Sequence, residues 1–388
     1  MLEIKSLDHS FNGIAKLNNK VVFVKNALPG EIVKIRIINE KKKYIEAIID
    51  KYIKTSKERI KPKCKYFGFC GGCDLLHLNY ENQLKYKQEK IENIFNKYLN
   101  VKTKINSIVF DKEFYYRNKV KFQVSDKIGF YKSNSYEVIP INNCLIANKK
   151  INNSIYYLNK LDLSNIKSIT CRVHSDKLMI DIEANKEIDI TPIVKIANSI
   201  YVNNKLIYGE KKLIEKLGNY NFVISPKSFF QVNKNVCLKL YDKIKEYVGE
   251  NKNILDLYCG CGSIGIYISN HNNILGIEIN DSAEKDALDN KKINSLNNID
   301  FICGDSSTKT NFKPDIVIVD PPRSGLNKKT IVEIINLKPK KIIYVSCNPM
   351  TLVRDLNLLT MFNIVEITPY DMFPNTKHCE SLVILEKK

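Results

Sequence analysis

The 388-residue sequence lacks any stretch apolar enough to cross a bilayer, and its first residues, Met1 to Lys5, contain no apolar signal run. Prolines are few, 12 in all, and the hydrophobic share of 44% is too high for a disordered chain. A chain of this length can bury more than one core. We therefore expect a multidomain, cytoplasmic protein that acts as a monomer, with no membrane partner.

Arginine is also scarce. Only six of the 61 basic side chains are arginine, and the 42 acidic side chains leave a formal net charge of +19. A general lysine bias explains such a total as well as nucleic-acid binding does, so the total alone decides nothing. The distribution is more informative, because residues 1–63 carry 15 basic and 7 acidic side chains. A basic module of this kind indicates a nucleic-acid partner.

Short strands are predicted throughout residues 1–57. Residues 20–24 form an apolar run, a turn follows at Leu28-Pro29-Gly30-Glu31, and residues 32–37 alternate between apolar and basic side chains. Residues 44–53 give another strand. This pattern is typical of a five-stranded OB-like barrel that binds nucleic acid, although any small β-barrel would share it.

Residues 58–220 are interpreted as a central domain and residues 221–388 as a C-terminal domain. Residues 80–99 are rich in helix formers without Gly or Pro, and we expect the helix over 80–100 to pack on the C-terminal domain. Residues 101–220 mix short strands and turns without a clear period. From residue 221, apolar strands at 253–258, 274–279, 315–320 and 341–346 alternate with helical stretches. That alternation predicts a doubly wound parallel sheet.

Eleven cysteines without a signal run argue against a disulfide framework and for metal binding or catalysis where they cluster. Cys64, Cys70 and Cys73 form C-x5-C-x2-C, and Cys144 is the next cysteine along the chain. Four thiolates can bind zinc or an iron–sulfur cluster. A triplet with one remote cysteine is more typical of [4Fe–4S], while zinc and unliganded thiols remain alternatives.

A glycine-rich loop, Gly260-x-Gly262-x-x-Gly265, follows the predicted strand at 253–258 and precedes a helix. Such a loop lets a ligand approach the backbone over the helix N-terminus. Glu278 ends the next strand, where a carboxylate would hold the ribose hydroxyls of an adenosine. This much fits both NAD and S-adenosylmethionine.

The later strand ends favour S-adenosylmethionine. Asp305 follows the third strand, where methyltransferases place a polar group near the adenine, and the fourth strand ends in Asp320-Pro321-Pro322-Arg323. A dehydrogenase has no need of this last motif. Amino-group methyltransferases carry an aromatic residue where Arg323 stands, and cytosine-5 RNA methyltransferases usually have a cysteine in this loop as well as a later one. Both classes are therefore disfavoured.

A single cysteine, Cys347, lies at the end of the fifth strand in Ser346-Cys347-Asn348-Pro349. Carbon 5 of uracil is too weak a nucleophile to attack a methyl group, but addition of a thiolate at carbon 6 makes an enolate that can. A base must then remove the proton on carbon 5. Glu380, at the start of the last predicted strand, is the candidate for that base.

These motifs together resemble the RNA uracil-5-methyltransferases that carry an N-terminal TRAM domain and a [4Fe–4S] cluster. The resemblance covers nearly the whole chain and rests on the following segments: Leu28 to Glu31, the four cysteines, Tyr116-Arg117-Asn118-Lys119, Ser228-Phe229-Phe230-Gln231-Val232-Asn233, the glycine loop, Asp320 to Arg323, Ser346 to Pro349, and Asp371-Met372-Phe373-Pro374 to Glu380. It implies an α/β fold with three parts: an OB-like TRAM barrel, a central mixed α+β iron–sulfur domain, and a doubly wound class I methyltransferase domain.

The resemblance also implies roles for individual residues. Cofactor contacts fall on Gln231, Tyr258, Glu278, Asp305 and Asp320. Cys347 becomes the nucleophile, Glu380 the base, and Cys64, Cys70, Cys73 and Cys144 the cluster ligands. The chain departs from the family pattern at two positions. Ser263 stands where some relatives have asparagine, which makes its cofactor contact doubtful, and Cys379 stands where most have a small aliphatic residue.

The resemblance favours ribosomal RNA of the large subunit as substrate, because members specialised for transfer RNA often lack the TRAM and cysteine modules. Transfer RNA is the alternative. Two hypotheses from other classes stay open: an RNA-binding chaperone that has lost methyltransferase activity, and a nucleotide-using iron–sulfur redox protein.

Overall fold

The computed structural model describes residues 1–227 and 229–388, and it divides into two compact units. The first comprises Met1–Lys90, Phe130–Ile139 and Phe373–Lys377, and the second comprises Ile91–Gly129, Pro140–Met372 and His378–Lys388. In the described part of the chain, no helix has the length and apolar character that a membrane span requires.

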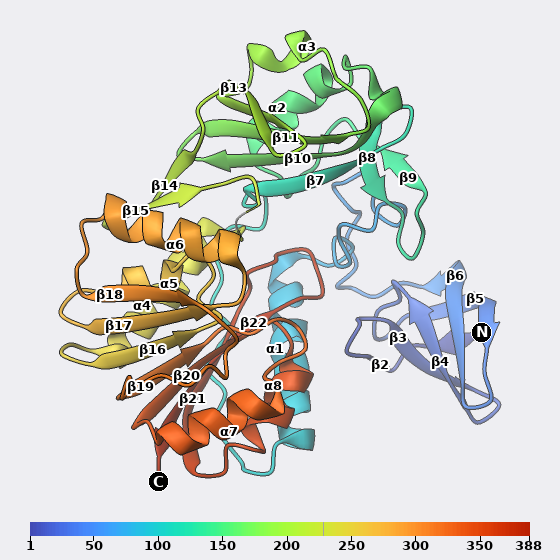
Figure 1. Ribbon diagram of the computed structural model, residues 1–388. Coiled ribbons are helices and arrows are strands. Elements are labelled where there is room, and N and C mark those ends of the chain that lie inside the picture. Colours follow the sequence, from blue (N-terminus) through green and yellow to red (C-terminus); the bar gives the residue numbers. More distant parts are fainter. Residues whose placement is uncertain (228) are drawn as a thin grey trace. The chain divides into compact units, whose positions relative to one another are not determined.

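The first unit contains a six-stranded sheet with the order β1-β5-β6-β4-β3-β2 (Figure 1). Its strands are Leu2–Glu3 (β1), Ser6–Leu7 (β2), Gly13–Leu17 (β3), Lys20–Lys25 (β4), Ile32–Glu40 (β5) and Tyr44–Lys54 (β6). Alternating side chains fill its core, including Val22, Val24 and Val33, none of which is exposed to solvent. The barrel-like sheet thus has one strand more than the five expected, and β1 and β2, at two residues each, are too short to show a period of two.

Buried Glu31 closes the turn after β4. Its carboxylate accepts hydrogen bonds from the Leu28 amide at 2.8 Å and from the Arg59 guanidinium nitrogen Nη2 at 2.8 Å. Arg59 also donates to the carbonyl of Asn26 at 2.6 Å. The Leu28–Glu31 turn therefore ties the barrel to the segment that leads to the cysteines.

Most of a sheet ordered β13-β12-β11-β10-β7-β8-β9 lies in the second unit, while Phe130–Tyr131 of β8 and Val138–Ile139 of β9 belong to the first. Its strands are Lys119–Val124 (β7), Ile128–Tyr131 (β8), Val138–Pro140 (β9), Ile166–His174 (β10), Lys177–Ala184 (β11), Ser199–Val202 (β12) and Lys205–Gly209 (β13). The helices here are α2 (Lys149–Leu158), a 3-10 turn at Leu163–Asn165 and α3 (Thr191–Val194), and a hairpin of β14 (Leu213–Leu217) and β15 (Tyr220–Ile224) follows. Apolar and polar side chains alternate along β7 and β10. One face of the sheet carries the buried apolar residues Val120, Phe122, Ile169 and Cys171, and the other face carries polar side chains.

The C-terminal sheet has the order β18-β17-β16-β19-β20-β22-β21, in which β16 to β20 pair in parallel and β22 pairs antiparallel with both of its neighbours. Its strands are Asn253–Leu257 (β16), Asn273–Glu278 (β17), Ile299–Cys303 (β18), Ile316–Val319 (β19), Lys341–Ser346 (β20), Phe362–Tyr370 (β21) and Glu380–Lys387 (β22). The helices are α1 (Tyr80–Tyr98), α4 (Lys234–Val248), α5 (Ser263–Tyr267), α6 (Asp281–Ile293), α7 (Lys328–Leu337) and α8 (Pro349–Leu356). The expected doubly wound methyltransferase sheet is confirmed, and its strands lie within one or two residues of the predicted ranges.

Apolar side chains on both faces explain why this sheet is sandwiched between helices (Figure 1). On one face, Ile91, Ile94 and Phe95 of α1 share a core with Ile331 and Ile334 of α7 and with Leu352 and Val353 of α8. In a parallel sheet the carboxyl ends of the strands gather at one edge. The loops that carry the candidate residues after β16, β17, β18, β19 and β20 therefore lie along that edge.

Candidate active site

The loop after β16 is held in a tight conformation. Tyr258 has φ 61° although it is not a glycine, and its hydroxyl accepts a hydrogen bond from Ser306 Oγ at 2.8 Å. Gly262 has φ 75°, and a Cβ there would lie 2.4 Å from Cζ of Phe301. Only glycine fits this position, because both the backbone angle and the space exclude a side chain. The loop then enters α5 at Ser263, whose hydroxyl lies 2.7 Å from the Tyr241 hydroxyl.

Glu278 closes the same loop from β17. One of its carboxylate oxygens accepts from the Gly260 amide at 2.9 Å and the other from the Asn280 amide at 2.8 Å. A carboxylate has about four acceptor sites, so two hydrogen bonds leave capacity for the hydroxyls of a ligand. Asp305, exposed after β18, accepts from the Ser307 amide at 2.9 Å, and the hydrogen bonds from Ser307 lower the pKa of its carboxyl.

Gln231 is buried in a segment that borders the glycine loop. The thiol of Cys261 donates to the Phe229 carbonyl at 3.6 Å, and the side-chain amide of Asn118 donates to the Gln231 carbonyl at 3.1 Å. Residues 229–231 therefore lie between the glycine loop and the central sheet. Ser228, which belongs to the same motif, lies outside the described residues.

Cys347 and Glu380 lie at the same end of the β20–β22 ladder, close enough for the charge of Glu380 to raise the pKa of the Cys347 thiol. Ser346 pairs with Ser381 in this antiparallel ladder, and Cys347 follows the first of these residues while Glu380 precedes the second. Cys347 is half-buried, whereas Glu380 is buried with 5% exposure. The carboxylate oxygen Oε2 of Glu380 has no hydrogen-bond partner among residues 1–227 and 229–388. A buried acceptor without a hydrogen-bond partner costs free energy of folding.

The electrostatics of this corner are dominated by burial and by like charges. Burial first, then Glu380 and Asp320, raise the pKa of the Cys347 thiol to about 11. Burial and Asp320 raise the pKa of Glu380 to about 8, and burial raises the pKa of Asp320 to about 7. Arg323 opposes these shifts, because its positive charge lowers the pKa of both Cys347 and Glu380.

Arg323 is a site residue that the sequence did not single out as one. Its carbonyl accepts from Asn348 Nδ2 at 3.0 Å and from the Thr351 hydroxyl at 3.2 Å, so the loop after β19 is bonded to the loop after β20. Its guanidinium lies 3.5 Å from Nε2 of His378. The signal was present in the Asp-Pro-Pro-Arg motif, where Arg323 served only to argue against other methyltransferase classes.

Cys64, Cys70 and Cys73 lie in the first unit and are half-buried, and Cys144 belongs to the second. Within the described ranges, no three His, Cys, Asp or Glu side chains come together in a way that could hold a metal ion. One feature of the first unit suits a sulfur ligand, because the Gly72 amide donates to Sγ of Cys70 at 3.4 Å.

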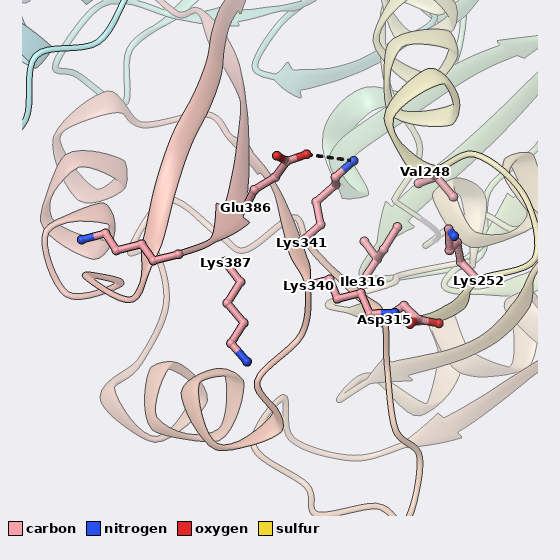
Figure 2. Close-up of a pocket in the computed structure, with 9 residues that line it drawn as sticks. Val248, Lys252, Asp315, Ile316, Lys340, Lys341, Glu386 and Lys387 are labelled. Carbon is pink, nitrogen blue, oxygen red and sulfur yellow. Dashed lines mark hydrogen bonds and ion pairs between the residues drawn. The ribbon is translucent and has the colours of Figure 1, made fainter.

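A cavity of about 540 Å³ opens at the other edge of the sheet, by the amino ends of β19 and β20 (Figure 2). Five lysines line it together with Asp315 and Glu386, and Lys341 forms an ion pair with Glu386 at 3.4 Å. None of the candidate site residues borders this cavity, so it plays no part in the site described above.

Comparison with known proteins places the chain in a family. A model described as tRNA (uracil-5-)-methyltransferase matches residues 174–388, and a TRAM domain model matches residues 2–49. The chain belongs to the tRNA (uracil-5-)-methyltransferase family. It is therefore an RNA methyltransferase of the uracil-5 class with an N-terminal TRAM domain.

The similarity to individual relatives extends along the whole chain. The chain is 33% identical to an uncharacterized RNA methyltransferase of Caldanaerobacter subterraneus subsp. tengcongensis, over 100% of this chain and 97% of the relative. It is also 33% identical to one of Staphylococcus aureus, over 99% and 97%. A solved structure, Pyrococcus abyssi tRNA (uracil-54, C5)-methyltransferase in complex with S-adenosyl-L-homocysteine, superposes with a TM-score of 0.84 at 27% identity, covering 99% of this chain and 100% of that one.

Proposed function

We propose that the enzyme transfers a methyl group from S-adenosylmethionine to carbon 5 of a uridine in RNA, with Cys347 as nucleophile and Glu380 as base. The observation that carries this proposal is the position of these two residues at the same end of the β20–β22 ladder, where the charge of Glu380 acts on Cys347. A nucleophile and a base within one crevice, beside the loop that follows β19, are what thiol-assisted methylation of a pyrimidine needs.

The proposed reaction has three steps: addition, methyl transfer and elimination. The Cys347 thiolate bonds to carbon 6, and the π electrons of the C5–C6 double bond move toward carbon 5 and the oxygen at position 4. Carbon 5 takes the methyl group, and S-adenosylhomocysteine leaves. Glu380 accepts the proton of carbon 5, the double bond forms again, and the thiolate is expelled. Buried and without a partner, Oε2 of Glu380 is available for that proton.

The cofactor is proposed to lie over the glycine loop. In this arrangement Glu278 binds the ribose hydroxyls, Asp305 lies near the adenine, and Tyr258, Gln231 and Asp320 border the methionine part. The solved relative with S-adenosyl-L-homocysteine bound supports a cofactor of this class. Glu278 already holds the Gly260 amide, so a ligand on its remaining acceptor sites would stabilise the loop as well.

We further propose a [4Fe–4S] cluster on Cys64, Cys70, Cys73 and Cys144. The support is the chemistry of four thiols and the amide hydrogen bond to Cys70. Bound there, the cluster would brace the loops that hold its ligands, and no step of the methyl transfer passes through it. Protein purified without air should contain about four irons per chain. One zinc and no iron would contradict this assignment.

The RNA class is proposed from the modules. Large-subunit ribosomal RNA is the first candidate, because the chain combines a TRAM domain with the four-cysteine pattern. Transfer RNA is the second, because the solved relative that spans the chain acts on tRNA. Mass-spectrometric mapping of 5-methyluridine in RNA from cells with and without the gene separates the two.

The activity itself is tested with purified protein, S-adenosylmethionine and total RNA that lacks the modification. The proposal predicts new 5-methyluridine in a single-turnover assay. RNA binding without any methylated uridine would favour the chaperone hypothesis, and failure to bind S-adenosylmethionine by calorimetry would favour the redox hypothesis. Either result would overturn the proposed function.

A further inference from the structure

The polar face of the central sheet carries positive charge at facing positions. Lys119 of β7 is paired directly with Arg172 of β10, so both side chains lie on the same face. Like charges at facing positions of two strands destabilise a sheet. The neighbouring pair on this face, Lys121 and Thr170, contains a single charge.

Burial makes this pairing more unfavourable. Arg172 is 1% exposed and Lys119 is half-buried, and Arg117 lies one residue before β7, with its guanidinium Nε donating to the Lys119 carbonyl at 3.0 Å. Burial, Arg172 and Arg117 lower the pKa of Lys119 to about 8. Two carboxylates oppose this charge: Asp181 of β11 acts on both Lys119 and Arg172, and Asp286 of α6 acts on Arg172. Three cations and two carboxylates leave one positive charge in excess, which a bound anion would offset.

Arg117 and Asn118 also contact residues 231–233, the segment beside the glycine loop. The Asn118 amide donates to the Val232 carbonyl at 3.0 Å, the Asn118 side chain donates to the Gln231 carbonyl at 3.1 Å, and Arg117 forms a β-bridge with Asn233. The excess charge therefore lies beside the proposed cofactor pocket, within the same compact unit as Cys347 and Glu380.

We propose that Lys119 and Arg117, backed by buried Arg172, form a binding site for a backbone phosphate of the RNA substrate. This inference rests on the proposed function, which brings an RNA strand to this crevice. The half-buried pair makes the contact, and Arg172 adds its charge from behind. The site explains why Tyr116-Arg117-Asn118-Lys119 joins two cations to an asparagine that holds the Gln231 segment: one motif positions the cofactor segment and the RNA strand together.

Lys119→Gln tests the site, with Lys121→Gln as the matched control. Lys121 lies on the same strand and the same face, but it is exposed and forms an ion pair with Glu183 at 3.6 Å. The probe is an oligouridylate of about 20 nucleotides, bound at salt concentrations from about 50 to 400 mM. Lys119→Gln should reduce the slope of log affinity against log salt by about 1 and weaken binding on the order of tenfold near 0.1 M salt. Lys121→Gln should change neither, and both variants should bind S-adenosylmethionine like the wild type.

The phosphate itself is identified with neutral linkages. In the RNA that the wild type methylates, one methylphosphonate linkage near the target should weaken wild-type binding on the order of tenfold and leave Lys119→Gln binding unchanged. An unaltered salt slope in Lys119→Gln would overturn the proposal. So would a loss confined to inorganic phosphate binding, which would indicate a small-anion site. If Lys119→Gln reduces the salt slope but the wild type forms no 5-methyluridine, the phosphate site is supported and the proposed function is wrong. If the wild type methylates RNA normally but Lys119→Gln leaves the salt slope unaltered, the proposed function is supported and the phosphate site is wrong.

Discussion

The thiol of Cys347 should make methyl transfer strongly dependent on pH. Its pKa of about 11 reflects burial and the carboxyl groups of Glu380 and Asp320. At pH 8 about one thiol in a thousand is then ionised, since each pH unit changes the ratio of thiolate to thiol tenfold. The single-turnover rate at saturating S-adenosylmethionine should therefore rise about tenfold per unit between pH 7 and 10.

Arg323→Gln sharpens this test. The positive charge of Arg323 lowers the pKa of Cys347 and of Glu380, so its removal should raise both and displace the rate profile to higher pH. The variant should be slow at pH 8 and approach the wild-type rate as the pH nears the pKa of the thiol. Arg354→Gln is the control, because Arg354 bonds to the carbonyls of Ser324 and Leu326 in the same loop but is not among the main groups that shift the pKa of Cys347.

The measurement is quenched-flow transfer of labelled methyl groups to RNA. A ratio of wild-type to Arg323→Gln rates that stays constant with pH would show that Arg323 acts through structure alone. A wild-type rate independent of pH over this range would refute the reasoning about the thiol.

Three further predictions concern stability and RNA binding. Glu380→Gln should stabilise the protein by about 4–5 kcal/mol in thermal unfolding at pH 9 but not at pH 4, because the pKa raised from 4.5 to about 8 means that stability is lost as pH rises through this range and a buried charge forms; equal effects at both pH values would contradict this. Gly262→Ala should lower the free energy of unfolding by about 2–5 kcal/mol, because the new Cβ meets both an unfavourable φ and the ring of Phe301. Gly30→Ala is the control, since its φ of 80° is similar but the space around it is open, and it should cost only about 1–2 kcal/mol. Equal losses in the two variants would show that the contact with Phe301 is unimportant. Replacing exposed Lys41, Lys42 and Lys43 of the barrel with glutamine should reduce the salt slope of RNA binding by up to about 3 without changing S-adenosylmethionine affinity, and an unchanged slope would argue against RNA contact by this turn.

The C-terminal sheet could be read from the sequence because its strands are continuous apolar runs with turn signals at both ends. Lys341–Ser346 was predicted to the residue, and the helix at 80–99 matches α1, Tyr80–Tyr98. Both segments have a uniform pattern that depends on local sequence alone.

The central sheet could not be read in this way. Along β10, Arg172 and His174 are buried as deeply as their apolar neighbours, so the alternation of polarity does not report which face is inside. Short strands such as β12, Ser199–Val202, and β9, Val138–Pro140, offer too few residues for any period. Their pairing partners lie elsewhere in the chain, and no local pattern records them.

The candidate site shows the same division. Cys347 and Glu380 could be named from their motifs, but their position at the same end of the ladder depends on β22 inserting between β20 and β21 with Ser346 opposite Ser381. That register is a tertiary property. Likewise, the unpartnered Oε2 of Glu380 and the pairing of Lys119 with Arg172 follow from burial and sheet order, which the sequence does not display.

The covalent step is the central claim, and trapping it on a denaturing gel tests it most directly. Glu380→Gln can still add its thiolate and transfer the methyl group, but the proton on carbon 5 has no acceptor, so a protein–RNA adduct should accumulate with ordinary RNA. Wild-type enzyme should form the corresponding adduct only with RNA that carries 5-fluorouridine at the target, because fluorine cannot leave as a cation. Cys347→Ala should bind S-adenosylmethionine normally and give no adduct with either RNA. Methylation by Cys347→Ala, or its cross-linking to fluorinated RNA, would contradict the mechanism.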